Sequence, residues 1–260
     1  MTRVMAPAKL TVSLAVTGVR PDGLHELRAE MVALSLADEL EISHGPTGLT
    51  VEVGPGTRAE ALGPDSDNLI ARALAAVGRT AAVHVVKRIP VGGGLGGGSS
   101  DAAAVLRWAG CRDAATALSL GSDVPFSLAG GRALVRGVGD VVTPLPFVRR
   151  EFVLLIPPFG VDTGRVYAAW DDRQRAGITE TGRNELTEAA LVVEPRLAQW
   201  RDALRELGAG DPVLAGSGST WFLDGGPPEA GTEALPWLSC GSARAPLVRA
   251  RTVPAGWGGD

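Results

Sequence analysis

The chain has 260 residues, of which 45% are hydrophobic and 21% charged, and its formal net charge at pH 7 is −4. These values exclude a disordered chain and leave room for one large or two small domains with buried cores. The acidic balance disfavours nucleic acid as a partner, and no apolar run approaches the roughly 18 residues that a membrane-spanning helix needs. Cys111 and Cys240 lie far apart and in no metal-binding spacing. We therefore expect a cytoplasmic protein without nucleic-acid or membrane partners.

The first part of the chain is rich in strand patterns. Alternating or extended apolar runs predict strands over residues 3–17, 25–36, 40–43 and 49–53. The turn-forming sequence GVRPDG at 18–23 separates the first two of these. A helix is predicted next, because Pro64–Asn68 supplies start signals ahead of an apolar face from Leu69 to Val77, and Gly78 ends it.

A glycine-rich stretch, PVGGGLGGGSSDAA at residues 90–103, is the most informative part of the chain. It follows a β-branched run at 82–86 and leads into an apolar helical pattern. Glycines allow positive φ angles and a close approach of ligand to backbone, and a helix start adds unpaired N–H groups and the positive end of its dipole. The hydroxyls of Ser99 and Ser100 add donors or reach a phosphate-bound metal. The stretch therefore predicts a triphosphate-binding loop.

Three other interpretations compete with a phosphate site. Gly92, Gly94 and Gly97 satisfy the spacing of the dinucleotide-binding fingerprint, but that motif needs an acidic residue closing a second strand about 20 residues on. Asp113 and Asp123, the acids near that offset, follow a helical stretch instead. A Walker A loop ends in Gly-Lys-Ser/Thr, and this loop has no lysine at its end. A flexible linker would not be framed by a strand and a helix.

The second half of the chain predicts a mixture of strands and helices. A short helix at 113–120 precedes a hairpin at 135–145 and a buried strand at 151–156. Helical patterns then occupy residues 163–176, 185–191 and 195–207, and a strand, a small Gly/Ser loop and a second strand span 212–224. Residues 225–243 show little periodicity, residues 245–253 predict a last strand, and the tail PAGWGGD is expected to fray. We expect one domain over residues 1–148 and a second over 149–260.

A few single residues are candidates for chemistry. Lys9 and Lys87 are the only lysines, so they are candidates for a role that needs a compact ammonium, although chance also explains them. Asp123 follows a helix end in a short apolar loop, as either a functional carboxylate or a cap of the next helix. His25 is either a packed or solvated strand histidine or a substrate contact. The loop at Gly216–Ser219 is either a hairpin turn or a second anion loop.

Taken together, these motifs resemble those of the GHMP kinase superfamily over about residues 5–224. Residues 90–103 resemble its glycine-rich ATP motif, and residues 214–222 resemble its third motif. Within the superfamily the chain is most similar to the family that phosphorylates 4-diphosphocytidyl-2-C-methyl-D-erythritol in the non-mevalonate isoprenoid pathway. The segments that carry this closer resemblance are residues 6–9, 18–27, 66–70, 94–103, 122–126, 161–163 and 184–186.

The resemblance implies a fold and an activity. The fold is a two-domain α+β GHMP kinase fold, with an N-terminal ribosomal-protein-S5-like ATP domain and a C-terminal ferredoxin-like α+β domain. The activity is ATP-dependent phosphorylation of the substrate's 2-hydroxyl, with ATP and Mg²⁺ as cofactors, in a monomer or weak homodimer. Phosphoryl transfer asks mainly for positioning and charge neutralisation, which an acid, an ammonium, an anion loop and Mg²⁺ supply.

The resemblance also implies residue roles. Asp123 would take the proton of the substrate hydroxyl, and Lys9 would stabilise charge on the hydroxyl and the transferring phosphoryl group. ATP would contact Asn68, Lys87, Pro90, Val91, Gly92, Gly93, Gly94, Leu95, Gly96, Gly97, Gly98, Ser99 and Ser100. The substrate, with its cytidine group, would contact His25, Thr163, Tyr167, Gly216 and Ser217. The ligand of Mg²⁺ is left unassigned, and Asp101 is expected to face away from the γ-phosphate or to approach it only through the metal.

The chain departs from this family at the cytidine end. Leu24 stands where the family usually has a tyrosine that stacks on cytosine, and such a stack is worth about 1–3 kcal/mol. Thr11 replaces a common asparagine, and the segment between Gly110 and Gly121 is shortened by about three helical turns. We expect a weaker hold on cytidine. The alternatives are a GHMP kinase for another small alcohol and a non-catalytic ATP-binding paralogue.

Overall fold

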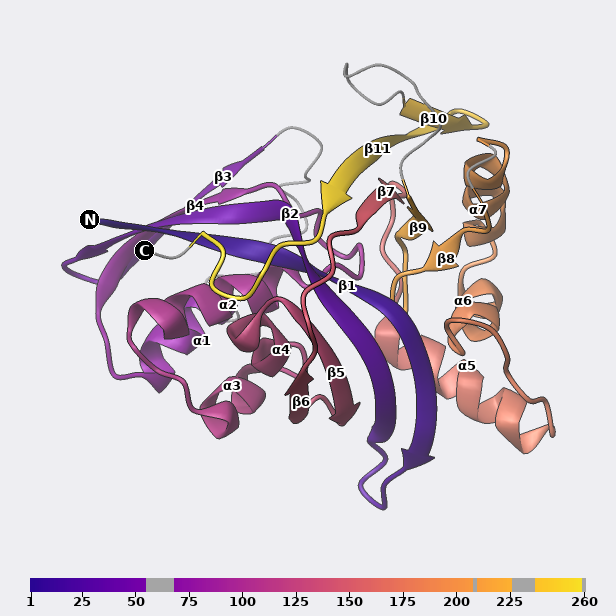
Figure 1. Ribbon diagram of the computed structural model, residues 1–260, viewed down its shortest axis with the longest axis horizontal. Coiled ribbons are helices and arrows are strands. Elements are labelled where there is room, and N and C mark those ends of the chain that lie inside the picture. Colours follow the sequence, from indigo (N-terminus) through magenta and orange to yellow (C-terminus); the bar gives the residue numbers. More distant parts are fainter. Residues whose placement is uncertain (55–67, 208–209, 226–236, 259–260) are drawn as a thin grey trace.

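The computed structural model describes residues 1–54, 68–207, 210–225 and 237–258. Within these ranges the chain forms two mixed layers of sheet and helix, which is the α+β class that the sequence predicts. Helices α1–α4 gather on one side of the first sheet, and α5–α7 lie beside the second (Figure 1). None of the helices in the described ranges is long and apolar enough to cross a membrane.

The first sheet is built from the N-terminal half of the chain. Its strands are β1 (Thr2–Val19), β2 (His25–His44), β3 (Gly48–Val53), β4 (Ala81–Lys87), β5 (Arg132–Gly137) and β6 (Val141–Pro144). The order is β3-β4-β2-β5-β6, with β1 paired to β2. The covering helices are α1 (Leu69–Ala76), α2 (Gly97–Trp108), α3 (Ala114–Leu120) and α4 (Val124–Ala129). The hairpin predicted at 135–145 is the antiparallel pair β5–β6.

Strand β2 is one continuous strand, where the sequence predicts two separate runs. It pairs with β1 along its length, while its first part pairs with β5 and its last part with β4. The polar pair Asp38–Glu39 suggests a break in the sequence, but both residues are buried. The buried Lys87 pairs with Asp38, and the exposed Arg88 pairs with Glu39, so the strand runs on through both residues.

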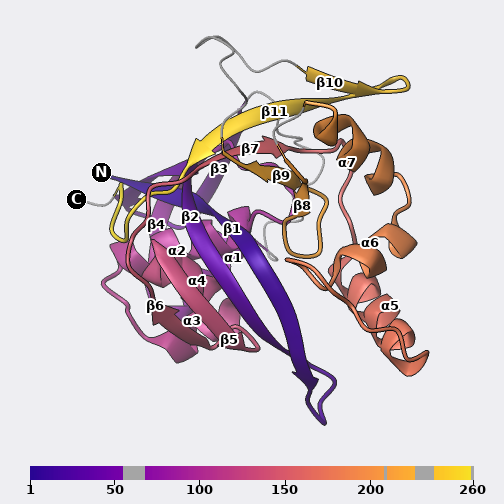
Figure 2. The ribbon, with the colours of Figure 1, turned by 45° about the vertical axis from the view of Figure 1, so that its right-hand side comes forward.

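The second sheet comes from the C-terminal half. Its strands are β7 (Glu151–Leu155), β8 (Val213–Leu214), β9 (Trp221–Asp224), β10 (Trp237–Cys240) and β11 (Ala243–Arg251), in the order β10-β11-β7-β9-β8. The helices of this half are α5 (Thr163–Arg175), α6 (Thr187–Val193) and α7 (Leu197–Arg205). Figure 2 shows the two halves side by side, with the connection between β8 and β9 turned toward the first half.

Buried apolar residues join the two halves. One cluster lies between the first sheet and α1–α4 and includes Leu40 and Leu106. Two further clusters draw on both halves: one brings Leu10 together with Phe152 and Phe222, and the other brings Phe126 together with Trp221. Because burial of apolar area is the main favourable contribution to folding, these shared cores hold the halves in a fixed relation. The division at residues 148/149 stays a prediction.

The last described residues return to the first sheet, so the expectation of a frayed tail is wrong. Thr252 bridges Leu34, the amide of Val253 donates to Ala33, and the amide of Met5 donates to the carbonyl of Gly258 at 3.1 Å. Both ends of the chain consequently lie at the same edge of the molecule (Figure 1). The tail closes over the start of β1.

Candidate active site

The glycine-rich loop joins the end of β4 to the start of α2 in a shape that side chains would not allow. Gly92, Gly94 and Gly96 have φ angles of 76°, 76° and 69°, which favour glycine. A Cβ on Gly94 would lie 2.6 Å from the carbonyl oxygen of Gly218, and one on Gly96 would lie 2.7 Å from Cγ of Lys9. The glycines therefore let a second loop and a lysine stem pack directly on the backbone of the first loop.

Helix α2 begins at this loop without a side-chain cap. Its N-cap residue is Gly96, and its first-turn amides have no side-chain acceptor there. The amide of Ser100 makes the first helical bond, to Gly96 at 2.9 Å, so the amides before it add to the positive end of the helix dipole. The Ser100 hydroxyl donates to the carbonyl of Pro7. An anion is the ligand that this combination of loop and helix end favours.

Lys9 and Asp123 meet beside the loop. Lys9 lies on β1, where its amide donates to Leu95 at 3.0 Å. Its Nζ lies 3.2 Å from Oδ2 of Asp123 and 3.3 Å from Oγ1 of Thr11. The lysine side chain is 8% exposed and the aspartate side chain 29%. An ammonium held against a half-exposed carboxylate at an anion loop is an arrangement that can move a proton and stabilise a developing negative charge.

Asp123 occupies the N-cap position of α4, but its side chain makes no capping hydrogen bond. The alternative interpretation of Asp123 as a helix cap is therefore wrong for its carboxylate. The carboxylate turns toward Lys9 instead, while the Asp123 carbonyl accepts from the amide of Ser127 and starts the helix. The backbone thus fixes the residue, and the side chain remains available for chemistry.

Lys87, by contrast, points into the protein. Its ammonium is paired with Asp38 and lies 2.5 Å from Oδ2 of Asp101, and all three residues are buried. The other oxygen of Asp38 accepts from the amide of Ile89 at 2.7 Å. This cluster ties β2, β4 and α2 together at the base of the glycine loop. The role of Lys87 as an ATP contact stays a prediction, since both its observed ion pairs lie inside the protein.

The charges of this buried cluster are strongly perturbed. Burial raises the pKa of Asp101 to about 7, against the opposing attraction of Lys87 and with a further upward contribution from Asp38. Burial alone would lower the pKa of Lys87, but the two carboxylates raise it, and the net shift is upward. Oδ1 of Asp101 has no hydrogen-bond partner among the described residues. One ammonium therefore serves two carboxylates in this cluster.

Asn68 lies at the start of α1, and α1 packs against α2, the helix that follows the glycine loop. Its Oδ1 accepts from the amide of Ile70 at 2.9 Å, so it caps the helix as the sequence signals predict. Its predicted contact with ATP would then use the remaining amide group. The start signals before it fall outside the described residues.

The residues predicted for the substrate's cytidine end lie in two groups. His25 and Tyr167 have ring centroids 4.5 Å apart, and Nε2 of His25 lies 2.9 Å from Oδ1 of Asp171. Burial and then the charge of Asp123 raise the pKa of Tyr167. A second group joins Oγ1 of Thr163 to Oγ of Ser217 at 2.8 Å. Tyr167, Thr163 and Ser217 lie on the C-terminal half, whereas His25 is the first residue of β2 in the N-terminal half.

The second glycine loop, residues 215–218, closes the site from the C-terminal half. Nδ2 of Asn184 donates to the carbonyls of Leu214 and Gly216, at 2.8 and 2.7 Å. A Cβ on Gly216 would lie 3.6 Å from Nζ of Lys9. The loop joins the antiparallel strands β8 and β9, as a hairpin connection does, and its Gly216 lies beside Lys9. Its role as an anion loop stays a prediction.

Sequence reasoning assigned no role to three residues that shape this site. Asp38 accepts from the amides of Arg88 and Ile89 at the base of the glycine loop. Asp171 orients His25, and Asn184 holds the second loop by hydrogen bonds to its carbonyls. A carboxylate within an apolar strand was the one local signal for Asp38. Asn184 lies in one of the segments that resemble the family, but its contacts with the second loop, like that of Asp171 with His25, join residues at least 30 positions apart.

Comparisons with known proteins agree with this geometry. Residues 68–131 match the model of the GHMP kinases N-terminal domain. The 4-diphosphocytidyl-2-C-methyl-D-erythritol kinase of Paracoccus denitrificans (strain Pd 1222) is 38% identical over 239 residues, which cover 85% of this chain and 85% of that protein. A crystal structure of 4-(cytidine 5'-diphospho)-2C-methyl-D-erythritol kinase has a TM-score of 0.65 and 34% identity, and covers 85% of this chain and 88% of that one.

The fold extends to a more distant relative. A crystal structure of L. major mevalonate kinase in complex with R-mevalonate has a TM-score of 0.66 at 13% identity, and covers 98% of this chain and 96% of that one. Identity this low supports the fold alone. The glycine loop, the Lys9–Asp123 pair and the identity to full-length relatives together lead to one conclusion: the chain belongs to the 4-diphosphocytidyl-2-C-methyl-D-erythritol kinase family of the GHMP kinases.

Proposed function

We propose that this enzyme transfers the γ-phosphoryl group of ATP to the 2-hydroxyl of 4-diphosphocytidyl-2-C-methyl-D-erythritol. The observation that carries the proposal is the contact between Nζ of Lys9 and Oδ2 of Asp123, 3.2 Å apart beside the glycine loop. The names of the relatives supply the substrate. The geometry supplies a reason for each group in the reaction.

Each charged residue has one task in this proposal. Asp123 accepts the proton of the 2-hydroxyl as the hydroxyl oxygen attacks the γ-phosphorus and the bond to ADP breaks. Lys9 neutralises charge on the attacking oxygen and on the phosphoryl group during transfer. Its position is fixed because its stem packs on Gly96. The amides of the glycine loop and the start of α2 hold the phosphates of ATP.

Mg²⁺ fits this site as a companion of the nucleotide. Among the described residues, no three His, Cys, Asp or Glu side chains lie together in a way that would hold a metal alone. Mg²⁺ keeps several waters and commonly takes one or two carboxylates along with substrate phosphates. The Ser99 hydroxyl, at the start of α2, is the group of this site that would contribute to such a shell. The metal would neutralise charge on the phosphates.

The cytidine end is proposed to lie between the two groups of substrate candidates. His25 and Tyr167 offer ring faces and the imidazole, while Thr163 and Ser217 offer hydroxyls close to Gly216. Leu24, next to His25 in the sequence, is 51% exposed. Since leucine has no ring, one face of the base is left without an aromatic partner. This observation favours the second candidate function, phosphorylation of another small alcohol by the same machinery.

ADP release tests the proposal directly. The enzyme with Mg²⁺ and ATP is expected to release ADP only when the cytidyl-methylerythritol substrate is added, with the phosphate found on its 2-hydroxyl by ³¹P NMR. Stimulation by homoserine or mevalonate, and not by this substrate, would favour the second candidate. A cytoplasmic location and a monomer or weak homodimer are further parts of the proposal, which gel filtration and cell fractionation test.

A further inference from the structure

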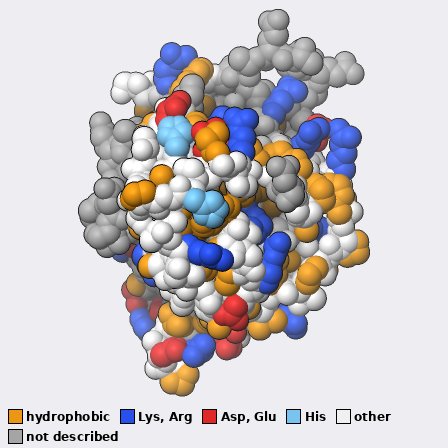
Figure 3. Space-filling view, turned by 90° about the vertical axis from the view of Figure 1, so that its left-hand side faces the viewer, with side chains coloured by type: hydrophobic (Ala, Val, Ile, Leu, Met, Phe, Trp, Pro, Cys, Tyr) orange, Lys and Arg blue, Asp and Glu red, His pale blue; other side chains and the backbone are white. Residues whose placement is uncertain are grey.

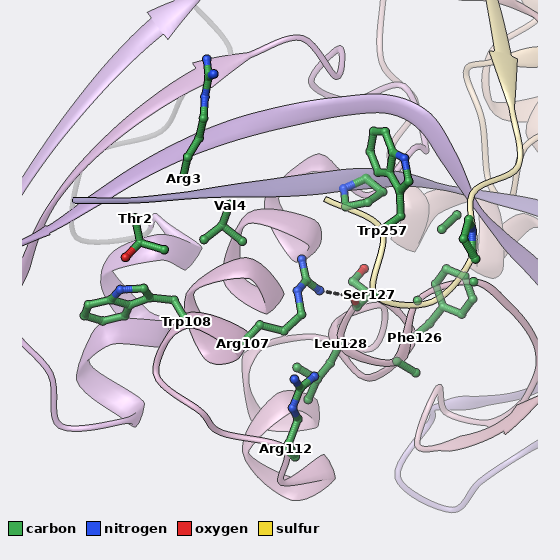
Figure 4. A pocket seen from close by; sticks show the side chains of 17 residues that line it. Thr2, Arg3, Val4, Arg107, Trp108, Arg112, Phe126, Ser127, Leu128 and Trp257 are labelled. Atoms are coloured by element: carbon green, nitrogen blue, oxygen red, sulfur yellow. Dashed lines mark hydrogen bonds between the residues drawn. The ribbon is translucent and has the colours of Figure 1, made fainter. Parts of the chain in front are cut away.

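A cavity of about 430 Å³ lies on the edge of the molecule where the two chain ends meet, apart from the Lys9–Asp123 site. Its walls come from the start of β1, the ends of α2 and α4, and the returning tail (Figure 4). Neither the glycine-rich loop nor Lys9 or Asp123 contributes to its lining. The volume is that of a pocket for a small organic molecule.

Arg107 brings a positive charge into this cavity without a matching negative charge. Its Nη1 donates to the carbonyl of Ser127 at 2.7 Å and its Nη2 to the carbonyl of Met5 at 3.0 Å. Both acceptors are neutral, and among the described residues no carboxylate lies within ion-pair distance of this guanidinium. Arg107 lines the cavity together with Arg112 (Figure 4). Burial and then the charge of Arg112 lower the pKa of Arg107 to about 10.

Ser127 adds an unpartnered hydroxyl to the same wall. The residue is 7% exposed, and its Oγ has no hydrogen-bond partner in the described part of the chain. A buried hydroxyl without a partner is costly, so such a group commonly marks a missing ligand or water. The Ser127 carbonyl is bound by Arg107, which places the hydroxyl and the guanidinium in one neighbourhood. Two cationic groups and one donor hydroxyl are a set that recognises an anion.

The rest of the lining is apolar and partly aromatic. Trp257 reaches the cavity from the tail, and Trp108 lies at its other end on α2, with Val4 and Leu128 between (Figure 4). The tail is held in place, because the amide of Met5 bonds to Gly258 and that of Trp257 bonds to Pro254. An inorganic ion bound alone would make no contact with these apolar side chains. Basic side chains are visible near the middle of the face that carries the chain ends (Figure 3), although the whole chain is acidic.

We propose that this cavity is a second ligand site, which binds a small organic anion. The phosphate or carboxylate group of the ligand lies against Arg107, Arg112 and the Ser127 hydroxyl, and its flat or apolar part lies against Trp257. The site is independent of the kinase reaction and of the nucleotide loop. Helix α4 lies between the two sites, and at its start the amide of Ser127 donates to the carbonyl of Asp123.

Calorimetric titration with 1-naphthyl phosphate tests the proposal. The full chain is first saturated with ADP, Mg²⁺ and CDP, so that the nucleotide loop and the cytidine end are filled. The protein is expected to bind one equivalent of the probe, and neutral 1-naphthol is expected to bind at least roughly tenfold more weakly because it lacks the charge-assisted hydrogen bonds. Equal binding of the two compounds, or no binding of the phosphate at millimolar concentration, would overturn the proposal.

Variants locate the binding. Arg112→Ala and Trp257→Ala are each expected to weaken binding of the probe by roughly tenfold. Arg79 is an exposed arginine outside the cavity lining, and Arg79→Ala is expected to leave the affinity for the probe unchanged. Arg107→Met removes two backbone tethers as well as a charge, so its result counts only if its melting temperature matches that of the unsubstituted protein. Binding that survives both Arg112→Ala and Trp257→Ala would show that the probe sits elsewhere and would contradict the proposal.

Discussion

The ammonium of Lys9 lies 3.2 Å from the carboxylate of Asp123, although the two residues belong to a strand and a helix that are more than 100 positions apart in the chain. Each is fixed by backbone bonds: the amide of Lys9 donates to Leu95, and the carbonyl of Asp123 accepts from Ser127. The pair is therefore set by the fold and not by flexible surface side chains. Sites held in this way need little reorganisation during reaction.

Replacing Lys9 tests the electrostatic half of the pair. Lys9→Met keeps the apolar stem that packs on Gly96 and removes only the charge. We expect kcat to fall by about 10²–10³-fold, which is typical for loss of one preorganised electrostatic contact, while ADP binding and the melting temperature stay near their original values. Lys9→Arg is expected to fail as a rescue, because a guanidinium does not fit the space of a compact ammonium. A small change in kcat would argue against a role for Lys9 in the transfer step.

Replacing Gly94 tests the packing of the two loops. Gly94→Ala would place a Cβ 2.6 Å from the carbonyl oxygen of Gly218 at a φ of 76°, so we expect a marked loss of both stability and ATP affinity. Gly78→Ala is the matched control: its φ is 62°, but nothing lies within 4 Å of the added Cβ. The control is expected to cost only the strain of a left-handed residue, about 1–2 kcal/mol, with ATP affinity retained. Urea unfolding and ADP calorimetry measure the two effects.

Asp101 makes the stability of the fold depend on pH. Its pKa is raised in the folded protein from 3.8 to about 7, so the folded state keeps a proton that the unfolded state releases. The stabilisation from this group is present below about pH 4 and is lost as the pH rises through about 7. As the pH rises through this window, we expect the unfolding free energy of the unsubstituted protein to fall relative to that of Asp101→Asn.

Asp113 serves as a control, because its pKa is shifted in the opposite direction to that of Asp101. Its side chain accepts from the hydroxyl and the amide of Thr116 at the start of α3, which lowers its pKa. The stabilisation from Asp113 is therefore present above its unfolded pKa and is lost as the pH falls. Urea unfolding of Asp101→Asn and Asp113→Asn at several pH values from about 3.5 to about 7.5 separates the two effects. This range runs from near the reference pKa of an aspartate to just above the raised pKa of Asp101. Parallel pH profiles for the two variants would refute the assignment for Asp101.

Leu24 tests how the cytidine group is held. Leu24→Tyr would place an aromatic ring at an exposed position next to His25, and we expect it to tighten the cytidyl substrate by about 1–3 kcal/mol, the worth of one base–aromatic stack. The gain should be seen in KM for the cytidyl substrate and not in KM for ATP. Leu24→Ile serves as the control without a ring. An unchanged KM in Leu24→Tyr would mean that the base does not lie beside this residue.

The sequence was sufficient where chemistry follows from short patterns. The glycine loop is framed by a strand and a helix, and Asn68 and Asp113 stand before the helices that they cap. Lys9 and Asp123 were both identified, although their contact came only from resemblance, since no local rule joins a strand to a distant helix start. The α+β class follows from the mixture of period-two and helical patterns.

The parts that the sequence missed depend on long-range contacts. Asp38 interrupts an apolar pattern and suggests a strand break, but Lys87 and the amide of Ile89 satisfy it inside the protein. The C-terminal tail lacks periodicity, yet the amide of Met5 at the other chain end fixes it. In both cases the decisive partner lies outside any window that a sequence pattern can use.

The central claim is that Asp123 is the base of a kinase specific for the cytidyl-methylerythritol substrate. The measurement is ADP release with Mg²⁺ and ATP, with and without that substrate, for the unsubstituted enzyme and for Asp123→Asn, which keeps the size of the side chain. We predict substrate-dependent release that falls by about 10²–10⁴-fold in the variant, with ADP binding intact. No stimulation by the substrate, or equal rates in the two proteins, would contradict this account.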